Sequence, residues 1–191
     1  MTMNPTEVVG LVTKTLNALG IPHMICGSLA SSVHGLPRAT MDADLVAEIK
    51  PEQAAPLVKA LEKNFYIDKE AILAAISESS SFNIIHLAST FKVDIFLLRN
   101  NPYSLNEFSR RTPQAVSGNS EPPFFVTAPE DVILGKLRWY RQGGEVSERQ
   151  WNDVIGVIQV QGERLDRKYL EQWAGELGLS DILAKAISES K

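Results

Sequence analysis

The sequence predicts an α+β protein, in which a small mixed sheet with helices is followed by a mainly helical half. Short apolar runs in the first hundred residues have the length of strands and are bounded by turn-forming residues. Apolar residues at helical spacing lie between these runs, and after residue 128 only helical patterns remain. We therefore predict two domains, 1–100 and 101–191.

Helices and strands alternate in the first predicted domain. A first helix begins at Asn4-Pro5, where Asn4 can cap the helix, and ends before Gly20. Further helices are predicted from 27 to 35, from 50 onward and over 69–77, and strands over 23–26, 42–49, 82–87 and 91–98. The last two strands are close enough in sequence to form a hairpin.

The second predicted domain begins with irregular chain and continues as helices. Residues 99–123 are predicted to form a short helix around 103–110 between two loops, followed by a strand at 124–126. Thr127 and Glu130 then have the spacing of a capping box. Helices are predicted over 129–141, 147–160, 167–177 and 179–188, with turns at glycines between them.

The composition is that of an ordinary globular protein. The 191 residues are 44% hydrophobic and 22% charged, and no apolar run approaches the roughly 20 residues that span a bilayer. The N-terminus lacks the pattern of a signal peptide and Cys26 is the only cysteine, so we expect a cytoplasmic protein without a disulfide. A net charge of −4 weighs mildly against binding to long nucleic acids.

Two acidic residues begin the strand at 42–49. Side chains two apart on a strand point to the same face, so Asp42 and Asp44 place two carboxylates side by side. Such a pair is repulsive and costly to desolvate, and divalent cations remove that penalty. The pair therefore predicts a metal site suited to phosphoryl transfer.

A Gly-Ser turn precedes this strand and leads into a short helix. The first N–H groups of a helix have no internal partners and carry partial positive charge. Gly27 allows close approach of a phosphate to the backbone, and the hydroxyl of Ser28 adds a donor. The turn therefore predicts contacts with phosphate groups.

Asp94 is a further acidic residue in a strand, within Lys92-Val93-Asp94-Ile95-Phe96. A buried carboxylate at this place needs a cation, a metal or a proton. The alternative is an edge strand in which Asp94 faces water and pairs with Lys92.

Gly27-Ser28 followed by Asp42-x-Asp44 resembles the motif of the DNA polymerase beta-like nucleotidyltransferase superfamily. The resemblance implies a minimal nucleotidyltransferase core over 1–100 that transfers a nucleoside monophosphate from an NTP with two Mg²⁺ ions. It implies that Asp42, Asp44 and Asp94 bind the metal ions and that Asp94 acts as general base. The acceptor would be RNA or tRNA, a protein or a small molecule.

Lys92-x-Asp94 is also similar to a motif of the AbiEii-like nucleotidyltransferases, the toxins of toxin–antitoxin pairs. This resemblance implies a toxin with an antitoxin protein as its partner. The helical half adds two loose matches to that family, Asp131-x4-Lys136 and Arg149-x3-Asp153. The resemblance implies that Lys92, Lys136, Arg149 and Asp153 help bind the nucleotide. The segment at 149–153 lacks a basic and an acidic residue common in the family pattern.

Each match in the helical half has a structural alternative. Lys136 could extend past its apolar neighbours into water, and Arg149 and Asp153 could form a surface ion pair worth a few tenths of a kcal/mol. Arg38, four residues before Asp42, suits a triphosphate or pyrophosphate. Its alternative is a loop arginine above the sheet edge.

Two other functions remain open at this point. One is a binding module that keeps the fold without turnover. The other is an antibiotic-modifying enzyme that transfers a nucleotide to a small molecule.

Overall fold

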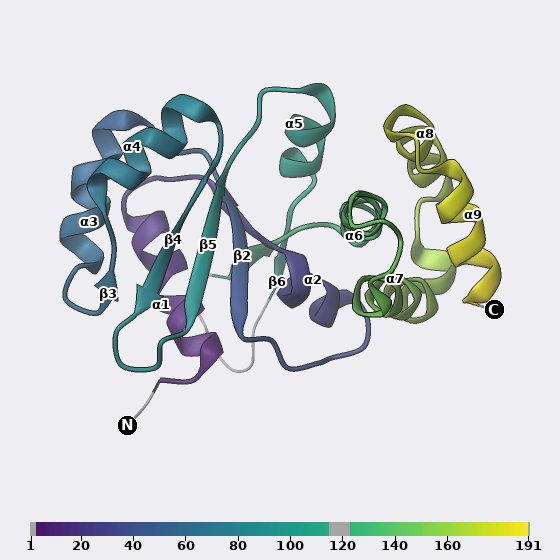
Figure 1. Cartoon of the computed structure of the whole chain (residues 1–191), viewed down its shortest axis with the longest axis horizontal. Coiled ribbons are helices and arrows are strands. Elements are labelled where there is room, and N and C mark those ends of the chain that lie inside the picture. Colours follow the sequence, from purple (N-terminus) through teal and green to yellow (C-terminus); the bar gives the residue numbers. More distant parts are fainter. Residues whose placement is uncertain (1–2, 115–122, 191) are drawn as a thin grey trace. The chain divides into compact units, whose positions relative to one another are not determined.

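The computed structural model describes residues 3–114 and 123–190 (Figure 1). The chain divides into two compact units. The sheet unit comprises Met1–Ile25 and Thr40–Val126, and the helical unit comprises Cys26–Ala39 and Thr127–Lys191. The predicted domains 1–100 and 101–191 stay a prediction. No helix in the described ranges combines the length and apolarity that crossing a membrane requires.

A seven-stranded mixed sheet is formed by the described residues, in the order β3-β4-β5-β2-β1-β7-β6. The strands are β1 (His23–Cys26), β2 (Asp42–Ala47), β3 (Phe65–Tyr66), β4 (Ser81–His86), β5 (Lys92–Leu97), β6 (Thr112–Gln114) and β7 (Phe124–Val126). β2 pairs in parallel with β5, and β4 pairs antiparallel with β5, as predicted for a hairpin. Strands β4, β5 and β2 lie side by side in Figure 1.

Alternating burial along β2 and β5 explains why these segments are strands. Every second residue is buried in both: Ala43, Leu45, Ala47, Val93, Ile95 and Leu97. The residues between them are half-buried. A strand with this pattern covers the core with one face and presents the other to ligands or solvent.

Helices α1 (Pro5–Ala18), α3 (Ala54–Leu61), α4 (Lys69–Glu78) and α5 (Pro102–Ser109) belong to the sheet unit. The predicted cap of α1 is confirmed, because the Asn4 side chain accepts a hydrogen bond from the backbone N–H of Glu7. Helix α3 packs on α1 and α4, and α4 packs on β4. A short 3-10 helix, η1 (Pro51–Gln53), directly precedes α3.

The helical unit contains α2 (Gly27–His34), α6 (Pro129–Gln142), α7 (Glu148–Gln161), η2 (Gly162–Arg164), α8 (Arg167–Leu177) and α9 (Ser180–Glu189). Helices α2, α6 and α7 pack on one another. A Cβ atom at Gly35 would lie 2.8 Å from the backbone nitrogen of Val157, so α2 ends directly against the backbone of α7. This contact positions the segment that follows α2.

The loop predicted after the helix around 103–110 is wrong at 112–114, and a second strand is also missing from the predictions. The segment predicted as loop contains β6, which pairs antiparallel with β7. Pro113 obscures it in the sequence, although proline is compatible with a strand at the edge of a sheet. The two-residue strand β3 is too short to produce an alternating pattern. The rest of the predicted loop, 115–122, lies outside the described residues.

Candidate functional site

Asp42, Asp44 and Asp94 lie on one face of the sheet. In the parallel pairing of β2 with β5, Asp44 is directly opposite Asp94, and Asp42 is opposite Lys92. Paired residues on neighbouring strands point to the same side, and so do residues two apart on one strand. All three carboxylates therefore share the half-buried face, opposite the apolar core. Strand β5 lies between β4 and β2, so the alternative of an edge strand for Asp94 is wrong.

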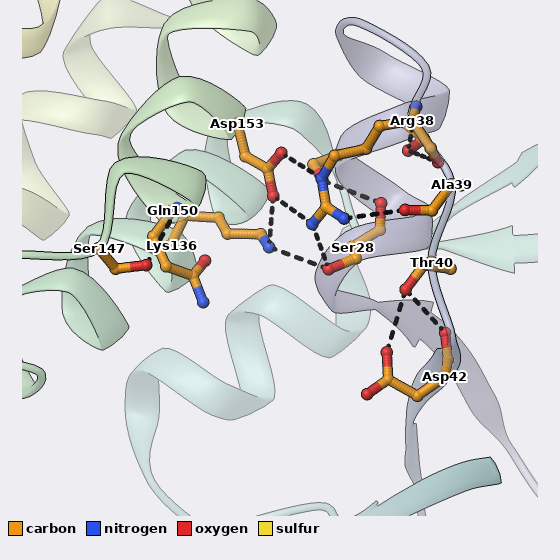
Figure 2. Close-up of polar contacts among 11 residues, drawn as sticks. Ser28, Arg38, Ala39, Thr40, Asp42, Lys136, Ser147, Gln150 and Asp153 are labelled. Carbon is orange, nitrogen blue, oxygen red and sulfur yellow. Dashed lines mark hydrogen bonds and ion pairs between the residues drawn. The ribbon is translucent and has the colours of Figure 1, made fainter.

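Lys92 and Thr40 contact two of these carboxylates, Asp94 and Asp42. Lys92 Nζ lies 2.7 Å from Asp94 Oδ2, with the lysine side chain 43% and the aspartate side chain 19% exposed. The hydrogen bond to Asp94 raises the pKa of Lys92, so the lysine side chain is protonated at neutral pH. Thr40 Oγ1 donates to Asp42 Oδ1 at 3.0 Å (Figure 2). Thr40 was not predicted as a site residue, although a hydroxyl two residues before a strand carboxylate is a recognisable local signal.

The donor chemistry of this face fits Mg²⁺. Mg²⁺ prefers oxygen ligands and usually combines a small number of carboxylates with water and substrate phosphates. Within the described residues, no three His, Cys, Asp or Glu side chains lie close enough together to hold a metal ion. A metal ion held by these aspartates would therefore need water and substrate phosphate to complete its coordination.

The Gly27-Ser28 turn has the backbone that the sequence suggested. Gly27 has φ of +59°, a left-handed conformation that other residues rarely adopt. It follows β1 directly and begins α2, and Ser28 in the first turn is buried. No side chain caps this helix end. The turn thus leaves helix N–H groups for an anionic ligand.

Three polar side chains of the helical unit gather around Asp153, and we call Ser28, Arg38, Lys136 and Asp153 the Asp153 cluster. Arg38 Nε and Nη2 donate to the two Asp153 oxygens at 2.8 and 2.9 Å. Lys136 Nζ lies 2.8 Å from Asp153 Oδ2. The Ser28 hydroxyl oxygen accepts from Arg38 Nη2 at 2.6 Å and from Lys136 Nζ at 3.5 Å. Figure 2 shows the two cations and the serine around the carboxylate.

Burial and charge act in opposite directions on Asp153. Burial alone would raise its pKa, but the hydrogen bonds from Arg38 and Lys136 outweigh that effect and hold the pKa below its usual range. Asp153 is therefore ionised at neutral pH. The cluster as a whole carries one net positive charge, which suits it to bind an anion.

The structure decides between the alternatives for these residues. Lys136 is only 5% exposed, so it does not extend into water as the alternative for this residue required. Asp153 is buried and pairs with Arg38 and Lys136, whereas Arg149 is exposed. The surface ion pair that was the alternative for Arg149 and Asp153 is therefore wrong, and Asp153 belongs instead to a buried cluster with Arg38 and Lys136.

Asp131 is buried near the start of α6, and its Oδ1 accepts a hydrogen bond of 2.6 Å from the Tyr169 hydroxyl of α8. The motif Asp131-x4-Lys136 therefore combines a residue that connects two helices with one that belongs to the Asp153 cluster. Tyr169 is 38 residues from Asp131, and no local pattern indicates their contact.

Comparison with solved structures identifies proteins of the same fold. An antigenic nucleotidyltransferase-like protein from Paracoccidioides brasiliensis superposes with a TM-score of 0.58 and 18% identity, covering 95% of this chain and 91% of the other. ANT(2'')-Ia in complex with adenylyl-2''-tobramycin has a TM-score of 0.56 and 12% identity, covering 90% and 95%. The lincosamide antibiotic adenylyltransferase LnuA has a TM-score of 0.50 and 10% identity, covering 84% and 99%.

The sequence itself matches no protein-family model and no curated protein. At these identities the shared property is the fold. The chain thus has a nucleotidyltransferase-like α+β fold.

Proposed function

We propose that this protein transfers a nucleoside monophosphate from an NTP to an acceptor in a Mg²⁺-dependent reaction. The observation that carries the proposal is the pairing of Asp44 with Asp94, with Asp42 on the same sheet face. A structural sheet rarely places three carboxylates on one half-buried face, because each costs desolvation energy. The nucleotidyltransferase-like fold and the Asp153 cluster support the same reading.

In this proposal Asp42, Asp44 and Asp94 hold two Mg²⁺ ions. When bound, Mg²⁺ neutralises the triphosphate and aligns it for in-line attack. Asp94 also takes the proton of the acceptor hydroxyl, as a general base. Lys92 orients Asp94 through their ion pair before substrate arrives, and then contacts the nucleotide.

The helical unit contributes the phosphate contacts. Gly27 and Ser28 offer a hydroxyl and helix N–H groups, and Arg38 and Lys136 offer positive charge. Arg149 on α7 is a further candidate contact for the nucleotide. Pyrophosphate release needs such cations because charge builds up on the leaving group.

A small molecule with a hydroxyl group is the acceptor class that we favour. ANT(2'')-Ia and LnuA, which modify antibiotics, are covered over 95% and 99% of their chains, so this chain has the size of such an enzyme. The toxin proposal, with tRNA or protein as acceptor and an antitoxin as partner, rests on the sequence motifs alone. In both cases, small-molecule modification and the toxin, we propose that the protein acts in the cytoplasm.

Labelled NTPs test this function. The purified protein is incubated with each α-labelled NTP and Mg²⁺, in separate reactions with aminoglycosides and lincosamides, total tRNA, and cell lysate. We expect label transfer to one acceptor, lost more than about a hundredfold in Asp42→Ala/Asp44→Ala. Full activity of that folded double variant would exclude the mechanism.

A binding module without turnover makes a different prediction. Calorimetry with each NTP would then show no heat that depends on Mg²⁺, and no acceptor would gain label. Heat of NTP binding that depends on Mg²⁺, together with transfer of label to an acceptor, would exclude a binding module without turnover.

A further inference from the structure

Asp153 is buried and firmly held by two cationic side chains. Its carboxylate receives three hydrogen bonds or ion pairs of 2.8 to 2.9 Å from Arg38 and Lys136, and its side chain is 6% exposed. It lies inside the helix α7, so the backbone fixes its position. Arg38 lies outside any helix or strand, on the segment after α2. The fixed partner is therefore Asp153, and the guanidinium group is the part that it orients.

We propose that Asp153 is a positioning residue, which holds the Arg38 guanidinium and the Lys136 ammonium in place for the NTP phosphates without contacting them itself. This inference rests on the proposed function for the identity of its ligand. It differs from the role that the sequence resemblance implies, in which Asp153 helps to bind the nucleotide.

The geometry of Arg38 supports this role. Nε and Nη2 of its guanidinium group face Asp153, which is the two-pronged pairing that fixes an arginine in orientation as well as position. Nη1 donates to the carbonyl oxygen of Ala39 at 3.2 Å. Ser32 Oγ accepts from the Arg38 backbone N–H at 3.4 Å, which fixes the base of the side chain. Loss of Asp153 would leave the end of the side chain without its main support.

The hydrogen bonds of Ser28 show where a ligand would meet the cluster. Its oxygen accepts from Arg38 and Lys136, so its single hydroxyl hydrogen points elsewhere. The two cations also polarise this hydroxyl and make it a better donor. An anionic oxygen beside Ser28 would receive that hydrogen together with the field of both cations.

The cost of the cluster argues against a merely structural role. Burying charges requires desolvation that the ion pairs offset only in part, and well-packed apolar residues would often be as stable. The Asp153 cluster buries a lysine, a carboxylate and part of an arginine with one net positive charge. A bound anionic ligand neutralises that positive charge, and ligand binding therefore explains why the cluster is charged rather than apolar.

Removal of the negative charge distinguishes positioning from simple electrostatics. If charge alone set the affinity, Asp153→Asn would bind anions more tightly, because the local positive charge increases. If positioning dominates, the same variant binds more weakly, because Arg38 and Lys136 lose their common support. The two explanations predict opposite signs.

The experiment measures binding of inorganic tripolyphosphate by calorimetry in the absence of Mg²⁺ and acceptor. We expect Asp153→Asn to raise the Kd about tenfold or more, and Asp153→Glu to restore part of the affinity. Asp181→Asn is the control, because both oxygens of Asp181 accept hydrogen bonds from an arginine, Nη2 of Arg141, but on an exposed surface. It should change the Kd by less than about twofold.

Arg38→Lys tests the proposal independently, including the case in which Asp153→Asn does not fold. It keeps the charge and loses the two-pronged pairing, so we expect weaker binding by a similar factor. Unchanged or tighter binding in folded Asp153→Asn or Arg38→Lys overturns the inference, and so does a wild type that does not bind tripolyphosphate. If wild type binds it but transfers no nucleotide, the proposed function fails and the positioning role stands.

Discussion

The stability of the helical unit depends on pH through Asp153, because Arg38 and Lys136 shift the pKa of this carboxyl. Arg38 and Lys136 hold the pKa of this carboxyl below its usual range, against the effect of burial. A group with a depressed pKa in the folded state stabilises the fold above its ordinary pKa. That contribution is lost as the pH falls from the ordinary value, 3.8, through the lower value of the folded state.

Chemical denaturation at several pH values tests this. At pH 7 we expect Asp153→Asn to lower the free energy of unfolding by roughly 2–4 kcal/mol, since it leaves buried cations without their carboxylate. The difference from wild type should shrink as the pH is lowered below 3.8, because the wild-type carboxyl then becomes protonated. A difference that stays constant over this range would contradict the assignment.

At the scale of elements, the position of the Arg38 segment depends on the contact between the end of α2 and α7. A Cβ atom at Gly35 would lie 2.8 Å from the nitrogen of Val157 and 2.9 Å from the carbonyl carbon of Gly156. Both neighbours are backbone atoms of a helix and cannot move aside cheaply. Glycine is therefore required here by close packing rather than by its φ angle, which is −130°.

Gly35→Ala tests the contact between α2 and α7. We expect a loss of about 1–3 kcal/mol of unfolding free energy, because the new methyl group forces the backbones apart. Denaturant titration of wild type and variant measures the loss.

Gly135→Ala is the matched control within α6, where a Cβ atom would meet nothing within 4 Å. It should raise stability by about 0.5–1 kcal/mol, since alanine is a better helix former than glycine. Equal effects of the two substitutions would show that the packing argument is wrong.

At the scale of the whole molecule, the two sets of candidate residues belong to different units. The carboxylates of β2 and β5 belong to the sheet unit, and the Asp153 cluster belongs to the helical unit. If each set supplies part of the substrate contacts, loss of either should reduce the thermal stabilisation of the protein by NTP.

Thermal unfolding with NTP, with and without Mg²⁺, measures this response. A ligand at a hundred times its Kd stabilises a protein by about 2.7 kcal/mol, which is several degrees for a chain of this size. We expect Mg²⁺ to increase the NTP-induced shift in wild type and to have no such effect in Asp42→Ala/Asp44→Ala. An equal Mg²⁺ effect in that variant would place the metal elsewhere.

The local sequence contains most of the information on secondary structure and on the carboxylate face. Strands β2 and β5 were predictable because each has an alternating pattern, and the start of α1 because it has a capping residue and a proline. The same alternation placed Asp42 and Asp44 on one face. The edge strand β6 was not predictable, because Pro113 and its short length hide it.

The sequence by itself determined the fold class, the shared face of Asp42 and Asp44, and the glycine-serine turn, because these depend on residues close together in the chain. Only the tertiary structure decided that Asp44 lies opposite Asp94, and that Asp153 pairs with Arg38 and Lys136. Those contacts join residues separated by long stretches of chain. Strand register and helix packing bring them together, and no local pattern of residues specifies them.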